Sequence, residues 1–134
     1  MIDNTLSRVD ILIQQKKFAA AEQILKDLLA KDANNIKFQA LLAEVMLQQD
    51  KFAAAESIID NAIGLSPDSA HLFYIKSRIA IQRDDLAGAE KNIVQAIRLD
   101  PYDADYYALL ANIKAYDHRP LILRGQIAHP EGIL

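Results

Sequence analysis

Cysteine and tryptophan are missing from this chain of 134 residues, which also contains only 4 glycines and 4 prolines. Without cysteine the chain can form no disulfide and no thiolate metal site. This fits a reducing compartment, and we expect the cytoplasm. The glycines Gly64, Gly88, Gly125 and Gly132 are too far apart to form a phosphate-binding loop.

Long apolar runs are also missing. No uncharged apolar stretch approaches the roughly 20 residues that a membrane helix requires. The first residues do not combine a basic segment with an apolar core, as a secretory signal would. With 51% hydrophobic and 25% charged residues, the composition is that of a folded protein of one domain.

Positive charge is not in excess. Lysine and arginine total 15 against 18 aspartates and glutamates, which gives a formal net charge of −3. Binding to nucleic acid usually requires a clustered basic surface, and the sequence contains no basic run. We therefore expect neither nucleic acid nor a membrane as a partner.

Residues in catalytic or metal-binding patterns are scarce. His71, His118 and His129 have no histidine partner one helical turn away, and no zinc motif accompanies them. The serines lack the glycines of a nucleophile elbow, and the pair Asp84 and Asp85 is explained by helix capping. The sequence thus predicts no metal, no cofactor and no enzymatic activity.

What the sequence does contain is an internal repeat. One six-residue segment occurs three times, as KFAAAE at 17–22, KFAAAE at 51–56 and DLAGAE at 85–90. Phe18, Phe52 and Leu86 are therefore spaced by 34 residues, and so are Pro67 and Pro101. A fixed period of this length indicates stacked supersecondary units.

Each unit is predicted to contain two helices, because apolar residues recur at helical spacing in both of its halves. Within a unit, Asp50 and Asp84 can adopt a left-handed conformation or cap the next helix. Between units the prolines interrupt the helix, and Asp68-Ser69 or Asp103 can cap the helix that follows. The expected helices are at about 3–15, 19–31, 36–49, 53–65, 70–83, 87–99 and 104–116.

The pattern of small residues resembles the tetratricopeptide repeat. The eighth position of each unit, which is small in that family, holds Val9, Ala43, Ser77 and Ala111. The twentieth, where the two helices cross closely, holds Ala21, Ala55 and Ala89, and the twenty-seventh holds Leu28, Ala62 and Ala96. The first copy departs most from the pattern, and the large residue at the fourth position is present only in Phe73 and Tyr107.

The resemblance covers residues 2–116 and implies an all-α fold. We expect a right-handed α-α superhelix, a TPR solenoid of three helical hairpins plus a seventh helix near the C-terminus. The expected domain is 1–116, with repeats at 2–35, 36–69 and 70–103 and a partial fourth repeat at 104–116. Residues 117–134 contain two prolines and two glycines and are predicted to be an irregular tail. This C-terminal segment can be the degenerate natural end of the protein, the point at which a longer repeat protein is cut short, or sequence foreign to the original gene.

The resemblance further implies a concave groove lined by positions 2, 5, 9 and 12 of each repeat. Carried over to this chain, the main candidates are Leu6, Asp10, Ile13, Lys37, Glu44, Leu47, His71, Tyr74, Arg78, Ile81 and Asn112. This mixture of apolar and charged groups suits a short amphipathic peptide or helix. The alternative is that these residues are simply solvated helix faces.

One branch of the family holds a C-terminal carboxylate with a lysine and an asparagine in the first repeat. The matching positions here are Leu6 and Asp10, so we do not expect that carboxylate clamp. The sequence predicts instead a non-enzymatic adaptor or scaffold that binds a partner protein. The alternative is a solenoid segment of a larger assembly, or a self-associating structural module.

The helix at 104–116 lacks the polar outer face that a terminal helix needs. By contrast, the helix at 19–31 carries Glu22, Gln23, Lys26 and Asp27 on its expected outer face. Either the apolar residues of the tail or a second copy of the chain must cover the remainder. We expect a homodimer through the C-terminal helix, because Pro120 and Gly125 disfavour a helix in the tail.

Overall fold

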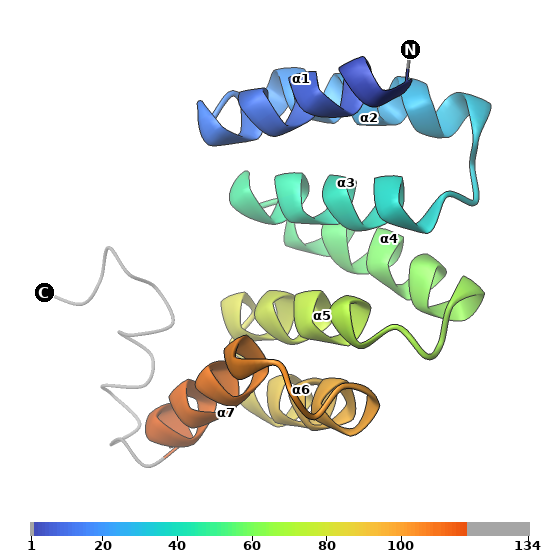
Figure 1. Cartoon of the computed structure of the whole chain (residues 1–134). Helices are drawn as coiled ribbons and strands as arrows, with labels where there is room; N and C mark the ends of the chain where they lie inside the picture. The colour runs from blue at the N-terminus through green and yellow to red at the C-terminus, as the bar shows by residue number, and fades with distance from the viewer. Residues whose placement is uncertain (1, 118–134) are drawn as a thin grey trace, which may run out of the picture. The chain divides into compact units, whose positions relative to one another are not determined.

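The computed structural model describes residues 2–117, and within this range it contains helices and no strand. The helices are α1 (Ile2–Gln14), α2 (Phe18–Lys31), α3 (Ile36–Gln48), α4 (Phe52–Leu65), α5 (Ala70–Gln82), α6 (Leu86–Leu99) and α7 (Ala104–Asp117) (Figure 1). Both ends of every predicted helix are confirmed to within one residue. Asp117, predicted as the start of the tail, is the last residue of α7, and the rest of the predicted tail lies outside the described residues.

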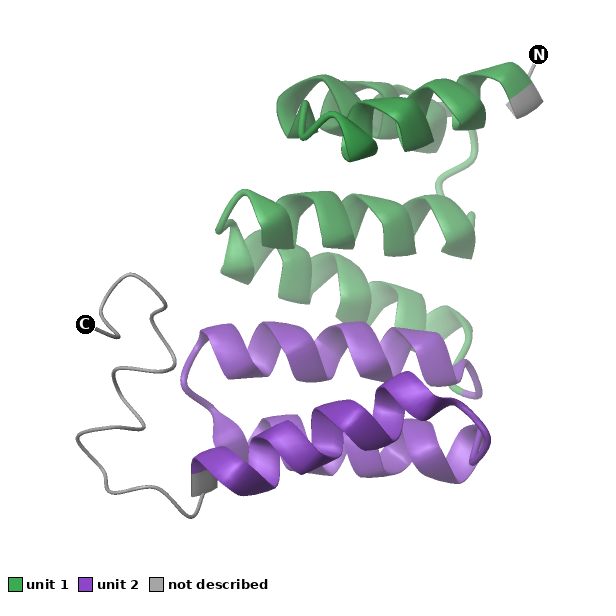
Figure 2. Ribbon diagram, turned by 60° about the vertical axis from the view of Figure 1, so that its left-hand side comes forward, with its two compact units in different colours: residues 1–67 green, residues 68–134 purple. Residues whose placement is uncertain are grey.

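The helices fall into two compact units, Met1–Pro67 and Asp68–Leu134 (Figure 2). In the first unit α1 packs on α2, α2 on α3, and α3 on α4. In the second unit α5 packs on α6, and α6 on α7. The first unit is thus two stacked helical hairpins, and the second is one hairpin followed by α7. No described helix is long and apolar enough to cross a membrane.

The turn inside each hairpin contains one residue with left-handed backbone. These residues are Lys16, Asp50 and Asp84, with φ of 59°, 62° and 62°. The left-handed conformation predicted for both aspartates is confirmed, and their short polar side chains tolerate it. The capping role falls to Asp85, whose carboxylate accepts a hydrogen bond of 2.9 Å from the Gly88 amide.

The turns between repeats differ in how they cap the next helix. Asn35 precedes α3 and its side chain accepts a hydrogen bond of 3.0 Å from the Phe38 amide. Asp103 accepts one of 2.8 Å from the Asp105 amide at the start of α7. The capping predicted for Ser69 is wrong, because its side chain makes no capping hydrogen bond although it occupies the N-cap position of α5.

The helices of each hairpin cross at the small residues found in the sequence. All three crossing alanines, Ala21, Ala55 and Ala89, are fully buried, as are Val9, Ala43 and Ser77 at the eighth position. Ser77 satisfies its buried hydroxyl by donating a 2.7 Å hydrogen bond to the Ala89 carbonyl oxygen. A larger side chain at these positions would have to push the helices apart.

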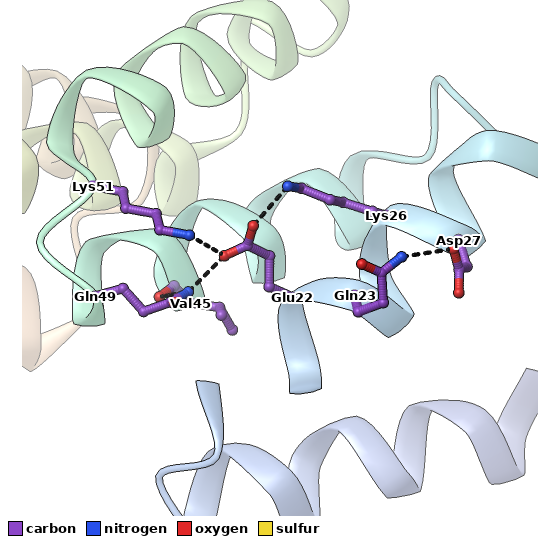
Figure 3. A network of polar contacts seen from close by, with 7 residues as sticks. All are labelled: Glu22, Gln23, Lys26, Asp27, Val45, Gln49 and Lys51. Atoms are coloured by element: carbon purple, nitrogen blue, oxygen red, sulfur yellow. Dashed lines mark hydrogen bonds and ion pairs between the residues drawn. The ribbon is translucent and has the colours of Figure 1, made fainter. Parts of the chain in front are cut away.

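Glu22 joins the first hairpin to the second (Figure 3). Its carboxylate contacts the ammonium groups of Lys26 at 2.6 Å and Lys51 at 3.0 Å, and accepts a 2.7 Å hydrogen bond from Gln49. Hydrogen bonds from these three side chains lower the pKa of Glu22 to about 2, against the opposing effect of burial. The prediction that Glu22 lies on the outer face of α2 is therefore wrong. Gln23 and Asp27 do lie there, exposed and joined by a 3.1 Å hydrogen bond.

Candidate peptide-binding surface

In the first unit, the candidate residues lie on α1 and α3, the first helices of the two hairpins (Figure 1). Asp10 and Lys37 are exposed, while Leu6, Ile13 and Glu44 are half-buried. Leu47 is buried, so it offers little surface to a ligand.

The structure brings Ile13 and Glu44 together in one cleft of about 240 Å³. The cleft lies where the end of α1 and the start of α2 meet α3. Its full lining is Ile13, Gln14, Lys16, Phe18, Glu44, Val45 and Gln48. Apolar side chains from three helices are thus accompanied by one acidic and one basic group, so the cleft suits an apolar side chain with a polar neighbour.

In the second unit, three candidates form a single cluster on α5. The rings of His71 and Tyr74 are stacked with centroids 6.2 Å apart. The guanidinium carbon of Arg78 lies 5.4 Å from the centroid of the Tyr74 ring, which is a cation–π distance. The spacing of three and four residues along one helix places these side chains on the same face.

The Tyr74 ring is supported by Tyr106 of α7, with ring centroids 5.1 Å apart. Tyr106 is buried, and burial raises the pKa of its phenol, with the carboxylates of Asp103, Asp100 and Asp105 adding to the effect. The groove positions of the repeat did not include Tyr106. The available signal was its spacing of seven residues from Ile113, since both are buried on the inner side of α7.

The two remaining candidates of the second unit do not join this cluster. Ile81 is half-buried and packs against the core formed by Ala80, Ala89, Ile93, Ala96, Tyr106 and Ile113. Asn112 is exposed on α7. Of the five candidates in this unit, the structure therefore gathers His71, Tyr74 and Arg78.

The chemistry of these surfaces is that of recognition. Aromatic faces, a guanidinium and a small apolar cleft can hold side chains of a peptide through packing and charge. Within residues 2–117, no group of three or more histidine, cysteine, aspartate or glutamate side chains is placed to hold a metal ion.

Several solved structures resemble the chain over most of its length. The first TPR of Spaghetti (RPAP3), bound to the HSP90 peptide SRMEEVD, is 18% identical with a TM-score of 0.77, covering 84% of this chain and 90% of that one. The second TPR domain of human RPAP3, in complex with the HSP70 peptide SGPTIEEVD, is 21% identical with a TM-score of 0.74, and the coverage is 82% and 92%.

A third similar structure is the type III secretion chaperone SycD of Yersinia enterocolitica, in complex with a peptide of the translocator YopD. It is 15% identical with a TM-score of 0.76, covering 87% of this chain and 95% of that one. At these identities the likeness shows the fold, an all-α helical solenoid. No curated protein sequence matches the chain.

The family model of the tetratricopeptide repeat matches residues 12–79 and 46–113, and the two matches together cover most of the chain. They agree with the 34-residue period, the buried crossing alanines and the helical hairpins. The chain therefore belongs to the tetratricopeptide repeat family.

Proposed function

We propose that the chain is a non-enzymatic adaptor that binds a short segment of a partner protein on the first helices of its repeats. The observation that carries the proposal is the cluster of His71, Tyr74 and Arg78 on α5, backed by Tyr106. It gathers three of the residues that the groove positions of the repeat select. Peptide complexes of RPAP3 and SycD support this role for the fold.

The chemistry of the surfaces defines the kind of segment. The Tyr74 ring offers a face for an apolar or aromatic side chain, and Arg78 favours an acidic group beside it. In the first unit, considered by itself, the cleft at Ile13 can take an apolar side chain next to Lys16 and Glu44. The proposed ligand of the α5 cluster is therefore a short amphipathic segment with an acidic residue.

The ligand should differ from the peptides held by the RPAP3 domains. Leu6 and Asp10 replace the donors of the carboxylate clamp, and Asp10 would repel a C-terminal carboxylate. We therefore expect no binding of the peptide SRMEEVD to this chain in a fluorescence anisotropy titration. Binding that is abolished by blocking the terminal carboxylate would contradict this expectation.

The adaptor proposal is tested by a pull-down from a lysate with the full chain and two matched variants. The first variant, Tyr74→Ala with Arg78→Ala, removes the cluster. The second, Tyr102→Ala with Arg98→Ala, makes the same chemical changes at exposed positions away from it. Only the first should lose the captured protein, while circular dichroism stays unchanged in both. Equal capture by both variants would refute the proposal.

A second candidate function, self-association, is favoured by the surface of α7. Tyr107 is 46% exposed, and Ala104, Ala108, Ala111 and Ala115 are also exposed, so most of one helix face is apolar and uncovered by the described residues. We propose that two copies associate through this helix. Light scattering on the full chain should give the mass of two chains at high concentration, and a single-chain mass at every concentration would refute the association.

A further inference from the structure

The face of α7 that remains open corresponds to the inside of a hairpin. In the three complete hairpins, the eighth position is fully buried beneath the second helix, at Val9, Ala43 and Ser77. At the same position of the partial fourth repeat, Ala111 is exposed, because no second helix follows among the described residues. α7 therefore presents a surface shaped to receive another helix.

The open face carries a pattern typical of helix pairing. Tyr106 and Ile113 bury the opposite side of α7. The exposed alanines are spaced by four, three and four residues, as at the a and d positions of a coiled coil. One flank of this row carries Asp105 and Asn112, and the other carries Tyr107 and Lys114. The alanine side chains of this row are small enough for a second helix to approach closely.

The residues that follow α7 do not suit this surface. In the repeat register, Leu123 stands where each complete hairpin has its crossing alanine. A leucine at a close crossing overpacks it, typically at about 1–3 kcal/mol. Pro120 stands where α2 and α4 begin with a phenylalanine. The occupant must therefore have a small residue at the crossing, and α7 itself meets this condition.

We infer that α7 pairs with α7 of a second copy in antiparallel orientation, about a two-fold axis between Ala108 and Ala111. The inference rests on the self-association proposed above and adds its geometry. The axis places Ala108 opposite the partner's Ala111, and Ala104 opposite the partner's Ala115. Both copies then use the same surface, as a two-fold interface requires.

The flanking residues complement each other in this register. In an antiparallel pair related by a two-fold axis, the flank with Asp105 and Asn112 on one helix lies beside the same flank of the other helix, and the flanks with Tyr107 and Lys114 likewise lie side by side. Asp105 therefore lies near the partner's Asn112, whose amide can donate to the carboxylate. On the other flank, the Tyr107 ring lies near the partner's Lys114, a cation–π pair. A parallel pair would leave Asp105 and Lys114 without these contacts.

The Lys114 flank also adjoins an open cleft. Lys114 is bound to Glu90 of α6 at 3.0 Å. Beside this pair lies a cleft of about 500 Å³, whose apolar lining includes Leu86, Val94 and Ile113. The partner's Tyr107, next to Lys114, reaches the edge of this cleft and can bury part of its ring there.

The size of the contact sets its strength. A 14-residue helix is about 21 Å long, so one helix pair buries less than the roughly 1,200 Å² of a standard interface. We therefore expect a dimer that dissociates on dilution.

Disulfide trapping tests the register, and the absence of cysteine in the chain removes any background. The full chain carrying both Ala104→Cys and Ala115→Cys should form a covalent dimer on mild oxidation. Each single variant should not, because in the antiparallel pair its two cysteines are about 16 Å apart along the axis and a disulfide needs Cα atoms within about 7 Å.

Three outcomes would overturn the inference. Covalent dimers of the single variants would indicate a parallel pair, and so would refute the register while the self-association stands. A single-chain mass in light scattering would refute both. A monomer that loses stability on both Leu123→Ser and Ala111→Glu would identify the chain's own C-terminal residues as the occupant. In the proposed dimer, Ala111→Glu halves the mass and leaves the helicity unchanged.

Discussion

The second helices of the first and third repeats carry the same glutamate in the same register, yet the two residues have different environments. The Glu22 side chain is 9% exposed and bound by Lys26, Lys51 and Gln49. The Glu90 side chain is 39% exposed, and within the described residues its one ion-pair partner is Lys114. The difference arises because the turn between α3 and α4 supplies two of the ligands of Glu22. A residue on a repeat surface thus acquires its role from the hairpin that follows it.

The largest effect should come from filling the hairpin interior. Ala43 and Ala111 occupy the same repeat position, but Ala43 is fully buried and Ala111 is exposed. Ala43→Leu should lower the free energy of unfolding by about 1–3 kcal/mol through overpacking. Ala111→Leu should change it by less than about 0.5 kcal/mol, measured by urea denaturation at dilutions where the chain is a monomer. Equal losses in the two variants would mean that the two sites do not differ in packing.

Acid should weaken the interactions of Glu22 with Lys26, Lys51 and Gln49. Its pKa is lowered from 4.5 to about 2 in the folded chain, so the carboxylate stabilises the fold above pH 4.5. This contribution, on the order of 1–3 kcal/mol, is lost as the pH falls through about 2. The stability difference between the wild type and Glu22→Gln in urea titrations should therefore shrink steadily below pH 4.5. A difference independent of pH would show that charge at Glu22 contributes nothing.

Removing one charge at a time sharpens the comparison at neutral pH. Glu22→Gln keeps the shape of the side chain but loses two ion pairs, and it should cost about 1–2 kcal/mol. Glu90→Gln loses one exposed pair and should cost less than about 0.5 kcal/mol. Both values come from chemical denaturation at pH 7. The comparison fails if Glu90→Gln is the more damaging change.

The smallest effects are expected from replacing the lysines that pair with the two glutamates, Lys51 with Glu22 and Lys114 with Glu90. Lys51→Ala removes a cation from a carboxylate that still binds Lys26 and Gln49, and it should cost about 0.5–1 kcal/mol. Lys114→Ala should cost less than about 0.5 kcal/mol because both partners are solvated. Raising the salt concentration should reduce the difference in unfolding free energy between Lys51→Ala and Lys114→Ala only slightly, since the carboxylate of Glu22 is shielded from solvent. A loss of stability at Lys114 as large as at Lys51 would contradict this reading.

The repeat made most of the fold predictable. The 34-residue period placed all seven described helices, and the crossing alanines fixed which faces are buried. The position of Glu22 could not be predicted from its own helix, because a helical wheel shows only that a polar residue lies away from the nearest core. Two of the three partners of Glu22, Gln49 and Lys51, lie 27 and 29 residues further along the chain.

The candidate site was predictable to a smaller extent. The repeat positions selected His71, Tyr74 and Arg78, which the structure gathers on one face of α5. They could not reveal that Tyr106 supports the Tyr74 ring, since that contact depends on how α7 packs. They also selected Leu47, which packing buries. Periodicity identifies the face of a helix, whereas neighbouring helices decide how much of that face stays accessible.

The left-handed residues in the hairpin turns have a consequence for folding kinetics. Asp50 and Asp84 are suited to this conformation, whereas Lys16 adopts it without a short polar side chain to help. We therefore predict that the first hairpin closes more slowly than the other two, because its turn must place Lys16 in a conformation that costs free energy. Lys16→Gly should remove this barrier and let the N-terminal hairpin form as early as its neighbours.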